Sequence, residues 1–350
     1  MITVKEIAKR CNVSPSTVSN ILNGRKNVGE QTRQRVMDCV KETGYQPNYF
    51  AQNIRKQSNR LLSIITEDLT VFGTNPMVEA IMAYCDDHNY RTILMNLRLY
   101  KKWKNTWYDE NEKIKAALKP IIQEALSIRV NGIIYVAGHC RVIDYFPPNF
   151  LIPAVITYGM SKDNRYPSII IDDEKGGYDT TRYLIARGHK KIGVIAGVMD
   201  NLHTKLRLLG YQKALFEEGV LYNPSLVNYG DWERQSGYHC AKGLVDEQVT
   251  AIFCMNDAMA VGAYDYLYEK NLIVGRDISV VGYDNMDISD CLRPRLTTNG
   301  IQLSEIGRRS AEIMIQMLED TDNNKNAVLT FKVPCKIVER ESVTALNLTY

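Results

Sequence analysis

The sequence predicts an α/β body of two doubly wound parallel-sheet lobes, preceded by a small all-α head. Three observations lead to this fold class. Short amphipathic helix patterns separated by turn residues occupy the start of the chain. After residue 60, short apolar strand patterns alternate with longer helical patterns, which is typical of parallel sheets covered by helices on both faces. These units form two consecutive sets, and 350 residues are enough for a head and two lobes.

A pair of short helices is predicted at the start of the head. Thr3 and Glu6 form the pattern of a capping box, so a helix is expected to begin directly after Thr3. Cys11–Val13 supply a turn. Ser14 is a natural N-cap for a second helix, and Pro15 suits the first position because its missing N–H has no helical partner there.

The second helix is predicted to have one apolar and one polar face. Val18, Ile21 and Leu22 recur at helical spacing, and Gly24 ends the helix. Small uncharged polar side chains occupy the opposite face. A short helix pair of this kind has the form of a helix-turn-helix reader of the DNA major groove.

On this interpretation the polar face of the second helix meets DNA. Ser16 and Asn20 are expected to read bases, while Thr17 and Ser19 hold phosphates. The residues of the helix pair expected to contact DNA are Thr3, Ser14, Pro15, Ser16, Thr17, Ser19, Asn20 and Asn23.

Charge is distributed unevenly along the chain. Residues 1–60 carry eleven Lys or Arg and four Asp or Glu, a net charge of +7. Residues 61–350 carry 32 basic and 36 acidic side chains, a net charge of −4. A polyanion is therefore expected to meet the head and not the body. The alternative is a head that is basic by chance, but the charge coincides with the helix pair.

A third helix and a connecting segment complete the head. Residues 26–44 alternate basic and apolar side chains at helical spacing, and Gly44 ends the helix. Pro47 then breaks the chain, and Asn48 can cap a short segment that runs to about Ser58. That segment is too short to be a stable isolated helix, so it is expected to fold only against DNA or a second copy. The alternative is a plain linker.

The body is predicted to hold two sets of βα units, followed by a helix-rich stretch. The expected strands of the first set are Leu61–Thr66, Arg91–Leu97, Gly132–Val136 and Ala154–Tyr158, and those of the second are Ser168–Ile171, Lys191–Ala196, Leu226–Tyr229, Ala251–Met255 and Ser279–Tyr283. The expected helices are Pro76–His88, Ile114–Ile128, Gly176–Arg187, Lys205–Glu218, Trp232–Glu247 and Ala258–Asn271. The stretch Pro294–Glu319 is again helix-rich.

A series of short motifs carries a resemblance to a known family. The head reads V-K-E-I-A-K-R-C-N-V-S-P-S-T-V-S-N-I-L-N, then T-R-Q-R-V, then G-Y-Q-P-N-Y-F-A-Q-N-I. The motifs of the body are Arg187–Ile195, Arg207–Tyr211, Gly230–Trp232, Phe253–Gly262, Val280–Asn285 and Pro294–Thr298. Each is weak alone, but in this order and spacing the chain resembles the lactose-repressor/galactose-repressor family of bacterial transcription regulators over roughly residues 2–340.

The resemblance implies the fold of periplasmic sugar-binding proteins, with three crossovers forming a hinge between the lobes. It divides the chain into a helix-turn-helix DNA-binding domain (1–46), a hinge helix (47–59) and a ligand-binding and dimerisation domain (60–340). Lobe one is expected at about 60–160 and 292–320, and lobe two at about 161–291 and 321–340. The hinge helix is expected to bring Asn48, Ala51 and Ile54 to DNA, with Ile54 where the family commonly has a Leu that wedges into the minor groove.

An effector is expected at the carboxyl ends of the strands, between the lobes. A sugar presents paired hydroxyls and apolar C–H faces, which suit bidentate carboxylate, amide and guanidinium groups and a stacking indole. The residues that match family effector-binding positions one by one are Arg207, Trp232, Asn256 and Asp284, and those that match by loop position only are Phe72, Asn201 and His203. The alternative for Trp232 is ordinary packing.

Enzyme, metal and membrane classes find no support in the sequence. Asp172 and Asp173 could form a catalytic pair, but a strand-end cap or surface feature is preferred. The eight Cys contain no C-x-x-C, so no metal, redox pair or cofactor is expected. The chain has no phosphate-binding or nucleophile motif, no apolar run of about 20 residues and no secretory segment, so a cytoplasmic protein is expected.

The expected function follows from the head and the body together. We expect a homodimeric repressor that binds pseudo-palindromic operator DNA and is released from a carbohydrate-use operon by a sugar. A dimer is preferred because the chain ends without a heptad run. The segment Tyr100–Glu110 is expected to be an inserted loop folded onto lobe one, or else a partner patch. The alternatives are a purine-type corepressor-dependent regulator and a sugar-binding protein that does not bind DNA.

Overall fold

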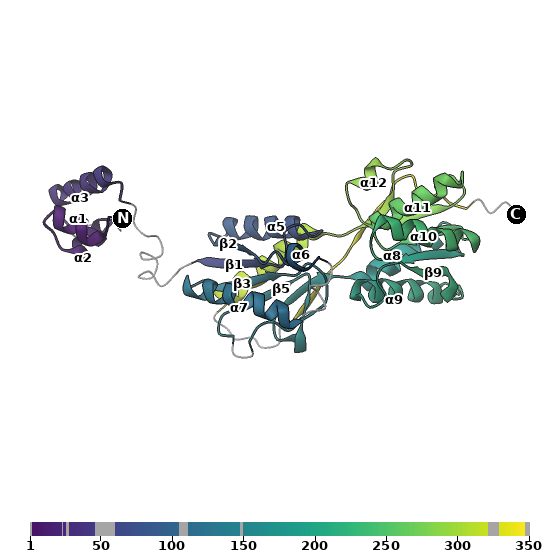
Figure 1. Ribbon diagram of the computed structural model, residues 1–350, viewed down its shortest axis with the longest axis horizontal. Coiled ribbons are helices and arrows are strands. Elements are labelled where there is room, and N and C mark those ends of the chain that lie inside the picture. The colour runs from purple at the N-terminus through teal and green to yellow at the C-terminus, as the bar shows by residue number, and fades with distance from the viewer. Residues whose placement is uncertain are drawn as a thin grey trace. The chain divides into compact units, whose positions relative to one another are not determined.

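The computed structural model describes residues 2–22, 24–25, 28–45, 60–104, 111–147, 150–320 and 329–346. Contacts divide the chain into two units, Met1–Arg60 and Leu61–Tyr350, which are drawn in Figure 1. Asn23 and the predicted hinge helix with Asn48, Ala51 and Ile54 lie outside the described residues.

The head is a three-helix unit whose helix starts are those predicted. Its helices are α1 (Val4–Arg10), α2 (Pro15–Leu22) and α3 (Glu30–Thr43). The capping box is confirmed, because the Glu6 amide donates to Thr3 Oγ1 at 3.3 Å and the Thr3 amide donates to Glu6 Oε2 at 2.7 Å. The Thr17 amide donates to Ser14 Oγ at 3.1 Å, so Ser14 caps α2 as expected.

The core of the head lies between the apolar faces of its three helices. Ile7 of α1, Val18 and Ile21 of α2, and Val36 of α3 are all buried. Because the apolar face of α2 is buried in this core, its polar face is turned away from the rest of the head.

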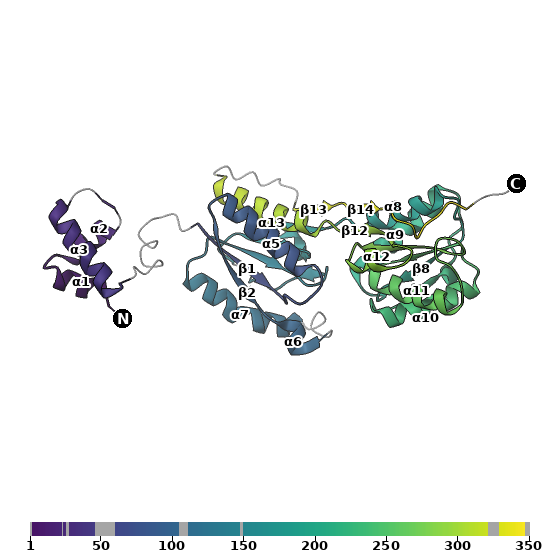
Figure 2. The ribbon, with the colours of Figure 1, turned by 90° about the horizontal axis from the view of Figure 1, so that it is seen from above.

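The first lobe of the body is built on a six-stranded parallel sheet in the order β13-β7-β5-β3-β1-β2. Its strands are β1 (Leu61–Thr66), β2 (Arg91–Asn96), β3 (Gly132–Val136), β5 (Ala154–Thr157), β7 (Ser168–Ile171) and β13 (Thr330–Val333). Helices α5 (Thr74–Asp87) and α13 (Leu303–Glu319) cover one face and α7 (Asn111–Ser127) covers the other, as Figure 2 shows. The small strands β4 (Val142–Ile143) and β6 (Met160–Ser161) pair beside this sheet.

The second lobe repeats this plan with the strand order β14-β12-β11-β10-β8-β9. Its strands are β8 (Ile192–Ala196), β9 (Val227–Tyr229), β10 (Ala251–Cys254), β11 (Ser279–Asp284), β12 (Thr297–Gly300) and β14 (Lys336–Val338). Only β14 is antiparallel to its neighbour among the described strands. The helices are α8 (Asp173–Ile185), α9 (Leu202–Glu217), α10 (Arg234–Asp246), α11 (Asp257–Glu269) and the short α12 (Ile288–Cys291), with α8 and α9 on one face and α10 and α11 on the other (Figure 2).

The chain passes between the two sheets three times, and this corrects the predicted lobe boundaries. The passages lie between β7 and α8, between β12 and α13, and between β13 and β14. The predicted division placed β7 and β13 in lobe two and β12 in lobe one, and the strand order reverses all three assignments. A short apolar run indicates a buried strand but does not specify which of two similar parallel sheets it joins.

The inserted segment after β2 begins with a short helix, α6 (Leu99–Trp103), instead of a loop. Leu99 is fully buried and Trp103 packs against the first-lobe core, in keeping with a segment folded onto the lobe up to Lys104. The rest of the insertion lies outside the described residues. Within the part of the chain that the structure describes, no helix is long and apolar enough to cross a membrane.

Candidate functional site

A buried ion-pair cluster lies at the carboxyl ends of the second-lobe strands. His203 and Arg207 are one turn apart on α9 and both contact Asp173, the first residue of α8. Arg207 Nε donates to Asp173 Oδ1 at 2.7 Å, and His203 Nδ1 lies 2.7 Å from Oδ2. Arg207 Nη1 also donates to the Met255 carbonyl. These bonds fix the guanidinium in one orientation.

The ionisation of this cluster follows from its pairing. Burial acts to raise the pKa of Asp173, but His203 and Arg207 outweigh it and lower that pKa. Burial acts to lower the pKa of Arg207, but Asp173 outweighs it and raises that pKa above its usual range. Asp173 and Arg207 are therefore both charged. The sequence interpretation of the pair was right for Asp172, which caps α8, and wrong for Asp173, which is a buried ion-pair partner.

Two aromatic rings border the guanidinium. The Arg207 Cζ atom lies 3.6 Å from the centre of the Tyr283 ring and 5.9 Å from that of Trp232. The Trp232 indole lies so close to the backbone of Gly197 that a Cβ atom there would overlap the ring. Glycine after β8 is therefore required for this placement of the indole.

Asp284 faces Arg207 from the end of β11. Its Oδ1 lies 3.9 Å from Arg207 Nη1, and the side chain is 9% exposed. Among the described residues no hydrogen bond reaches the Asp284 carboxyl group. Burial raises its pKa well above the usual value, although Arg207 opposes the rise. Asp284 has φ 104° and Asn285 has φ 56°, so the strand ends in a strained turn.

A second buried carboxylate holds that turn in place. Asp257 Oδ2 accepts from the Met286 amide at 2.8 Å and from Ser289 Oγ at 2.7 Å, and Oδ1 accepts from Thr298 Oγ1 at 2.7 Å. These three bonds tie the start of α11 to the segment after Asp284 and offset the backbone strain.

The remaining predicted effector residues either cap helices or have no described contact with the buried ion-pair cluster. Asn256 donates to the Trp232 carbonyl at 2.9 Å and caps α11, so its amide positions Trp232. Asn201 caps α9. Phe72 is 40% exposed between β1 and α5, and no described contact joins it to the second-lobe cluster.

Lobe one presents a different set of side chains to the cluster. Tyr158, directly after β5, is 5% exposed and its ring centre lies 5.4 Å from that of His203. Burial and then Asp284 raise its pKa. Burial and His203 lower the pKa of His139 to about 3. Tyr158 and His139 are thus the first-lobe neighbours that sequence reasoning missed, because neither lies in a recognised motif.

The polar face of α2 carries the candidate DNA contacts. Pro15 and Ser16 are exposed, and Thr17, Ser19 and Asn20 are partly exposed. Ser14 Oγ lies 2.7 Å from Ser16 Oγ and 2.8 Å from Thr17 Oγ1, so the three hydroxyls form one network. Thr3 is engaged in the capping box of α1.

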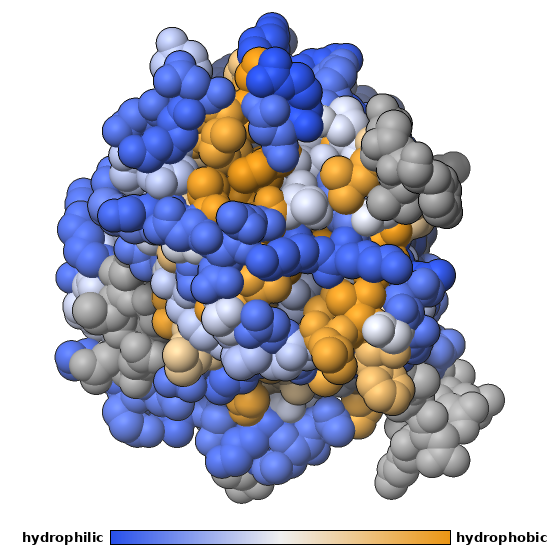
Figure 3. Space-filling view, turned by 90° about the vertical axis from the view of Figure 1, so that its right-hand side faces the viewer, coloured by the Kyte–Doolittle hydropathy of each residue, from blue (hydrophilic) through white to orange (hydrophobic). Residues whose placement is uncertain are grey.

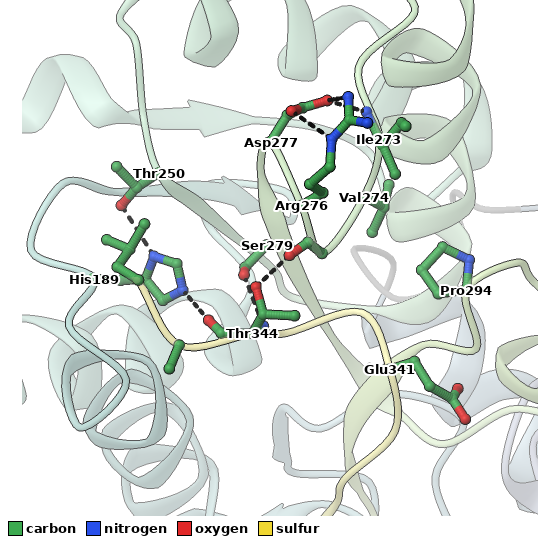
Figure 4. Close-up of a pocket in the computed structure, with 13 residues that line it drawn as sticks. His189, Thr250, Ile273, Val274, Arg276, Asp277, Ser279, Pro294, Glu341 and Thr344 are labelled. Carbon is green, nitrogen blue, oxygen red and sulfur yellow. Dashed lines mark hydrogen bonds and ion pairs between the residues drawn. The ribbon is translucent and has the colours of Figure 1, made fainter. Parts of the chain in front are cut away.

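A separate cavity of about 590 Å³ lies at the opposite edge of the second sheet (Figure 4). His189 Nε2 donates to the Thr344 carbonyl at 3.0 Å, and its Nδ1 lies 3.1 Å from Thr250 Oγ1. Arg276 is paired with Asp277. Seen from that end of the lobe, apolar residues gather in separate patches between hydrophilic ones (Figure 3). The polar groups of the cavity satisfy one another, so it is a weaker ligand site than the cluster at the strand ends. No group of three metal-binding side chains occurs within the described ranges.

Comparison with known proteins agrees with this arrangement. Residues 3–48 match the family described as bacterial regulatory proteins, lacI family, and residues 181–343 match a periplasmic binding protein-like domain. The chain is 30% identical to the HTH-type transcriptional repressor PurR of Pasteurella multocida (strain Pm70), over 98% of this chain and 99% of the relative. It is 29% identical to the repressor of the same name from Vibrio atlanticus (strain LGP32), over 99% and 100%.

Among solved structures, the lac repressor dimer bound to operator and the anti-inducer ONPF aligns with a TM-score of 0.78. It is 27% identical, and the alignment covers 98% of this chain and 99% of that one. A helix-turn-helix head on two parallel-sheet lobes defines a DNA-binding transcriptional repressor. The chain belongs to the lacI family of bacterial regulatory proteins. Its relatives are repressors, in agreement with the expectation that it is not an enzyme.

Proposed function

We propose that this protein is a cytoplasmic homodimer that represses a carbohydrate-use operon and leaves its operator when a sugar binds beside Arg207, Trp232 and Asp284. The observation that carries the proposal is the contrast between two carboxylates. Asp173 is satisfied by Arg207 and His203, whereas Asp284, whose side chain is 9% exposed, lies 3.9 Å from Arg207 and accepts no hydrogen bond from the described residues. A buried acceptor of this kind needs a ligand donor.

The chemistry of the cluster suits a sugar. Vicinal hydroxyls donate to a carboxylate such as Asp284, and the N–H groups at the remaining edge of a guanidinium donate to sugar oxygens. The Trp232 indole offers an apolar surface to the C–H face of the ring. Asn256 and Gly197 fix that indole in place before the ligand arrives, which reduces the entropy lost on binding.

DNA binding is proposed to use the polar face of α2 in the major groove. The face is exposed, uncharged and set in a head with a net charge of +7 over residues 1–60. A two-fold dimer would present two such heads to a pseudo-palindrome. A monomer has one head and would contact only one half-site.

A purine-type corepressor is the second candidate. The observation in its favour is that two relatives that align over 99% and 98% of this chain are repressors named PurR. A purine also stacks on an indole and presents N–H donors to a carboxylate. The two candidates predict opposite effects of the ligand on operator affinity, because a sugar inducer weakens operator binding and a corepressor strengthens it.

A ligand panel followed by an operator titration separates the candidates. Sugars and nucleobases are screened against the full-length protein, because a ligand that binds only the native state raises the melting temperature. Operator is selected from a random DNA pool, and its affinity is measured with and without the hit. A sugar that lowers operator affinity supports the proposal, a purine that raises it supports the second candidate, and a hit without effect on operator contradicts both.

A further inference from the structure

Three polar groups around the cluster make no hydrogen bond to the described residues, and one of them, His203 Nε2, is a buried atom. His203 is 6% exposed, and its Nε2 atom has no hydrogen-bond partner although Nδ1 is bound to Asp173. The Asp284 carboxyl group receives no hydrogen bond, and neither does the hydroxyl of Tyr158, as far as the described residues extend. Buried polar atoms are normally satisfied, so the unpartnered His203 Nε2 marks a place where a ligand completes the structure, and Tyr158 and Asp284 have hydrogen-bonding capacity left beside it.

The three groups come from both lobes and lie in one neighbourhood. The rings of Tyr158 and His203 lie 5.4 Å apart, although Tyr158 follows a first-lobe strand and His203 lies on α9 of lobe two. Among the charged groups that act on the pKa of Tyr158, Asp284 has the largest effect and raises that pKa, and Asp284 Oδ1 lies 3.9 Å from Arg207 Nη1. A ligand that reaches all three therefore touches both lobes.

Three residues with a positive φ stand at the same place. Tyr158 has φ 62°, Trp232 has φ 73° and Asp284 has φ 104°. Residues other than glycine rarely adopt a positive φ. Each stands at or just after the carboxyl end of a strand. Strain of this kind persists where the side-chain direction matters for function.

The charges around this volume sum to no net positive charge. The Arg207 guanidinium is compensated by Asp173 through a bond of 2.7 Å. The charged groups that act on Asp284 are one guanidinium, Arg207, and two carboxylates, Asp173 and Asp257. With histidine counted as neutral and Asp173 and Asp257 as ionised, the site carries a net charge of −1 when Asp284 is protonated and −2 when it is ionised. An anionic ligand would bring like charges together in a buried place.

We propose, on the basis of the effector site assigned above, that it takes an uncharged ring compound bound by Tyr158, His203 and Asp284, and that it excludes phosphorylated ligands. The free sugar or free nucleobase is then the effector, and the sugar phosphate or nucleotide is not. Tyr158 is the specificity-determining residue from lobe one.

Paired ligands test this proposal on the full-length protein. Galactose, ribose, cellobiose, hypoxanthine and guanine are titrated calorimetrically, each beside its phosphorylated derivative. The neutral member of one pair should bind, and its phosphorylated derivative should bind about a hundredfold more weakly. Tyr158→Phe should weaken that neutral ligand about tenfold, the size expected for one hydrogen bond, without changing the melting temperature of the free protein.

The matched control is Tyr84→Phe, which removes a hydroxyl from α5 in the same lobe. It should leave ligand affinity unchanged. A phosphorylated derivative that binds as tightly as its neutral parent overturns the inference and leaves the proposed repressor function intact. If no member of any pair binds, the proposed effectors are contradicted. The exclusion of anions is then tested with a probe that does not require a known effector.

That probe is inorganic phosphate. Phosphate should raise the melting temperature of Asp284→Asn more than that of the wild type, because the substitution removes the uncompensated carboxylate beside Arg207. Binding of phosphate to the basic head is common to both proteins and cancels in the comparison. Asp284→Ser serves as the second variant if Asp284→Asn does not fold. Equal phosphate shifts in the variant and the wild type would overturn the exclusion of anions.

Discussion

Among single residues, Asp284 is the one whose removal is expected to stabilise the free protein. Burial raises its pKa, so the folded state binds this proton more tightly than the unfolded state does. Its contribution to stability is present below the unfolded pKa and is lost as pH rises through the folded pKa. Asp284→Asn should therefore raise the melting temperature by a gain that is absent in acid, grows as pH rises from the unfolded pKa to the folded pKa, and stays constant above it.

Differential scanning calorimetry across the acid-to-neutral range measures this gain. Asp200→Asn is the control, because the Asp200 side chain is 95% exposed and should show little pH-dependent effect. A variant that melts below the wild type at every pH would show that the native carboxylate has a compensating partner.

Asn20 is the residue expected to carry base discrimination in the head. It lies on α2 next to the buried Val18 and Ile21 and is partly exposed. Because an amide can pair bidentately with adenine, Asn20→Ala should remove about 1–3 kcal/mol of discrimination at one operator position. Fluorescence anisotropy with operators varied base by base measures it, and Gln31→Ala on exposed α3 is the control. An equal loss for every operator variant would assign Asn20 to phosphate contact instead.

The candidate site shows which residues a sequence can and cannot reveal. Arg207, Trp232 and Asp284 follow strand patterns that place them at one sheet edge, so their proximity was predictable. Asp173 was not, because its partners lie 30 and 34 positions along the chain on another helix. Tyr158 was missed because a positive φ after a strand leaves no mark in apolar periodicity.

Among the secondary-structure elements, the end of β8 contacts the segment after β9 through the Trp232 side chain, which packs against Gly197. A Cβ at Gly197 would overlap the Trp232 indole, so Gly197→Ala should displace that ring and weaken effector binding. Fluorescence of the indole should also change. Effector affinity measured by calorimetry tests the first expectation.

A double-mutant cycle with Trp232→Leu separates the overlap from other effects of the alanine. Once the indole is absent, Gly197→Ala should cost little further stability. If its cost is the same with and without Trp232, the overlap is not the reason that glycine stands there.

Helices and strands were predictable where periodicity and capping signals are strong. The α1 and α2 starts, β1 and β3 agree with the predicted positions to the residue. The strands β12, β13 and β14 were not predicted, and none of them is part of a repeated strand–helix pattern in the sequence. Their placement depends on tertiary pairing that no local pattern encodes.

For the whole molecule, effector and operator binding are expected to be linked reciprocally. A ligand held by both lobes favours the lobe arrangement that it fits best, and only that difference in affinity shifts the population. The factor by which the effector changes operator affinity must therefore equal the factor by which operator changes effector affinity. Titrations in both orders on the full-length protein measure the two factors.

Asp284→Ala should abolish this response while leaving effector-free operator binding near that of the wild type. The substitution removes at least one charge-assisted hydrogen bond to the ligand, typically about 1.5–3 kcal/mol. The wild-type protein at the same effector concentration is the reference. A variant that still responds fully would remove Asp284 from the effector site.

The three passages of the chain between the sheets also set an order of events during synthesis on the ribosome. The head is one continuous stretch and can fold as soon as it has emerged. Neither sheet of the body can be finished until β13 and β14 have been translated, because these last strands complete opposite sheets. The head of a nascent chain can therefore already be folded while the two lobes are still being translated and are incomplete.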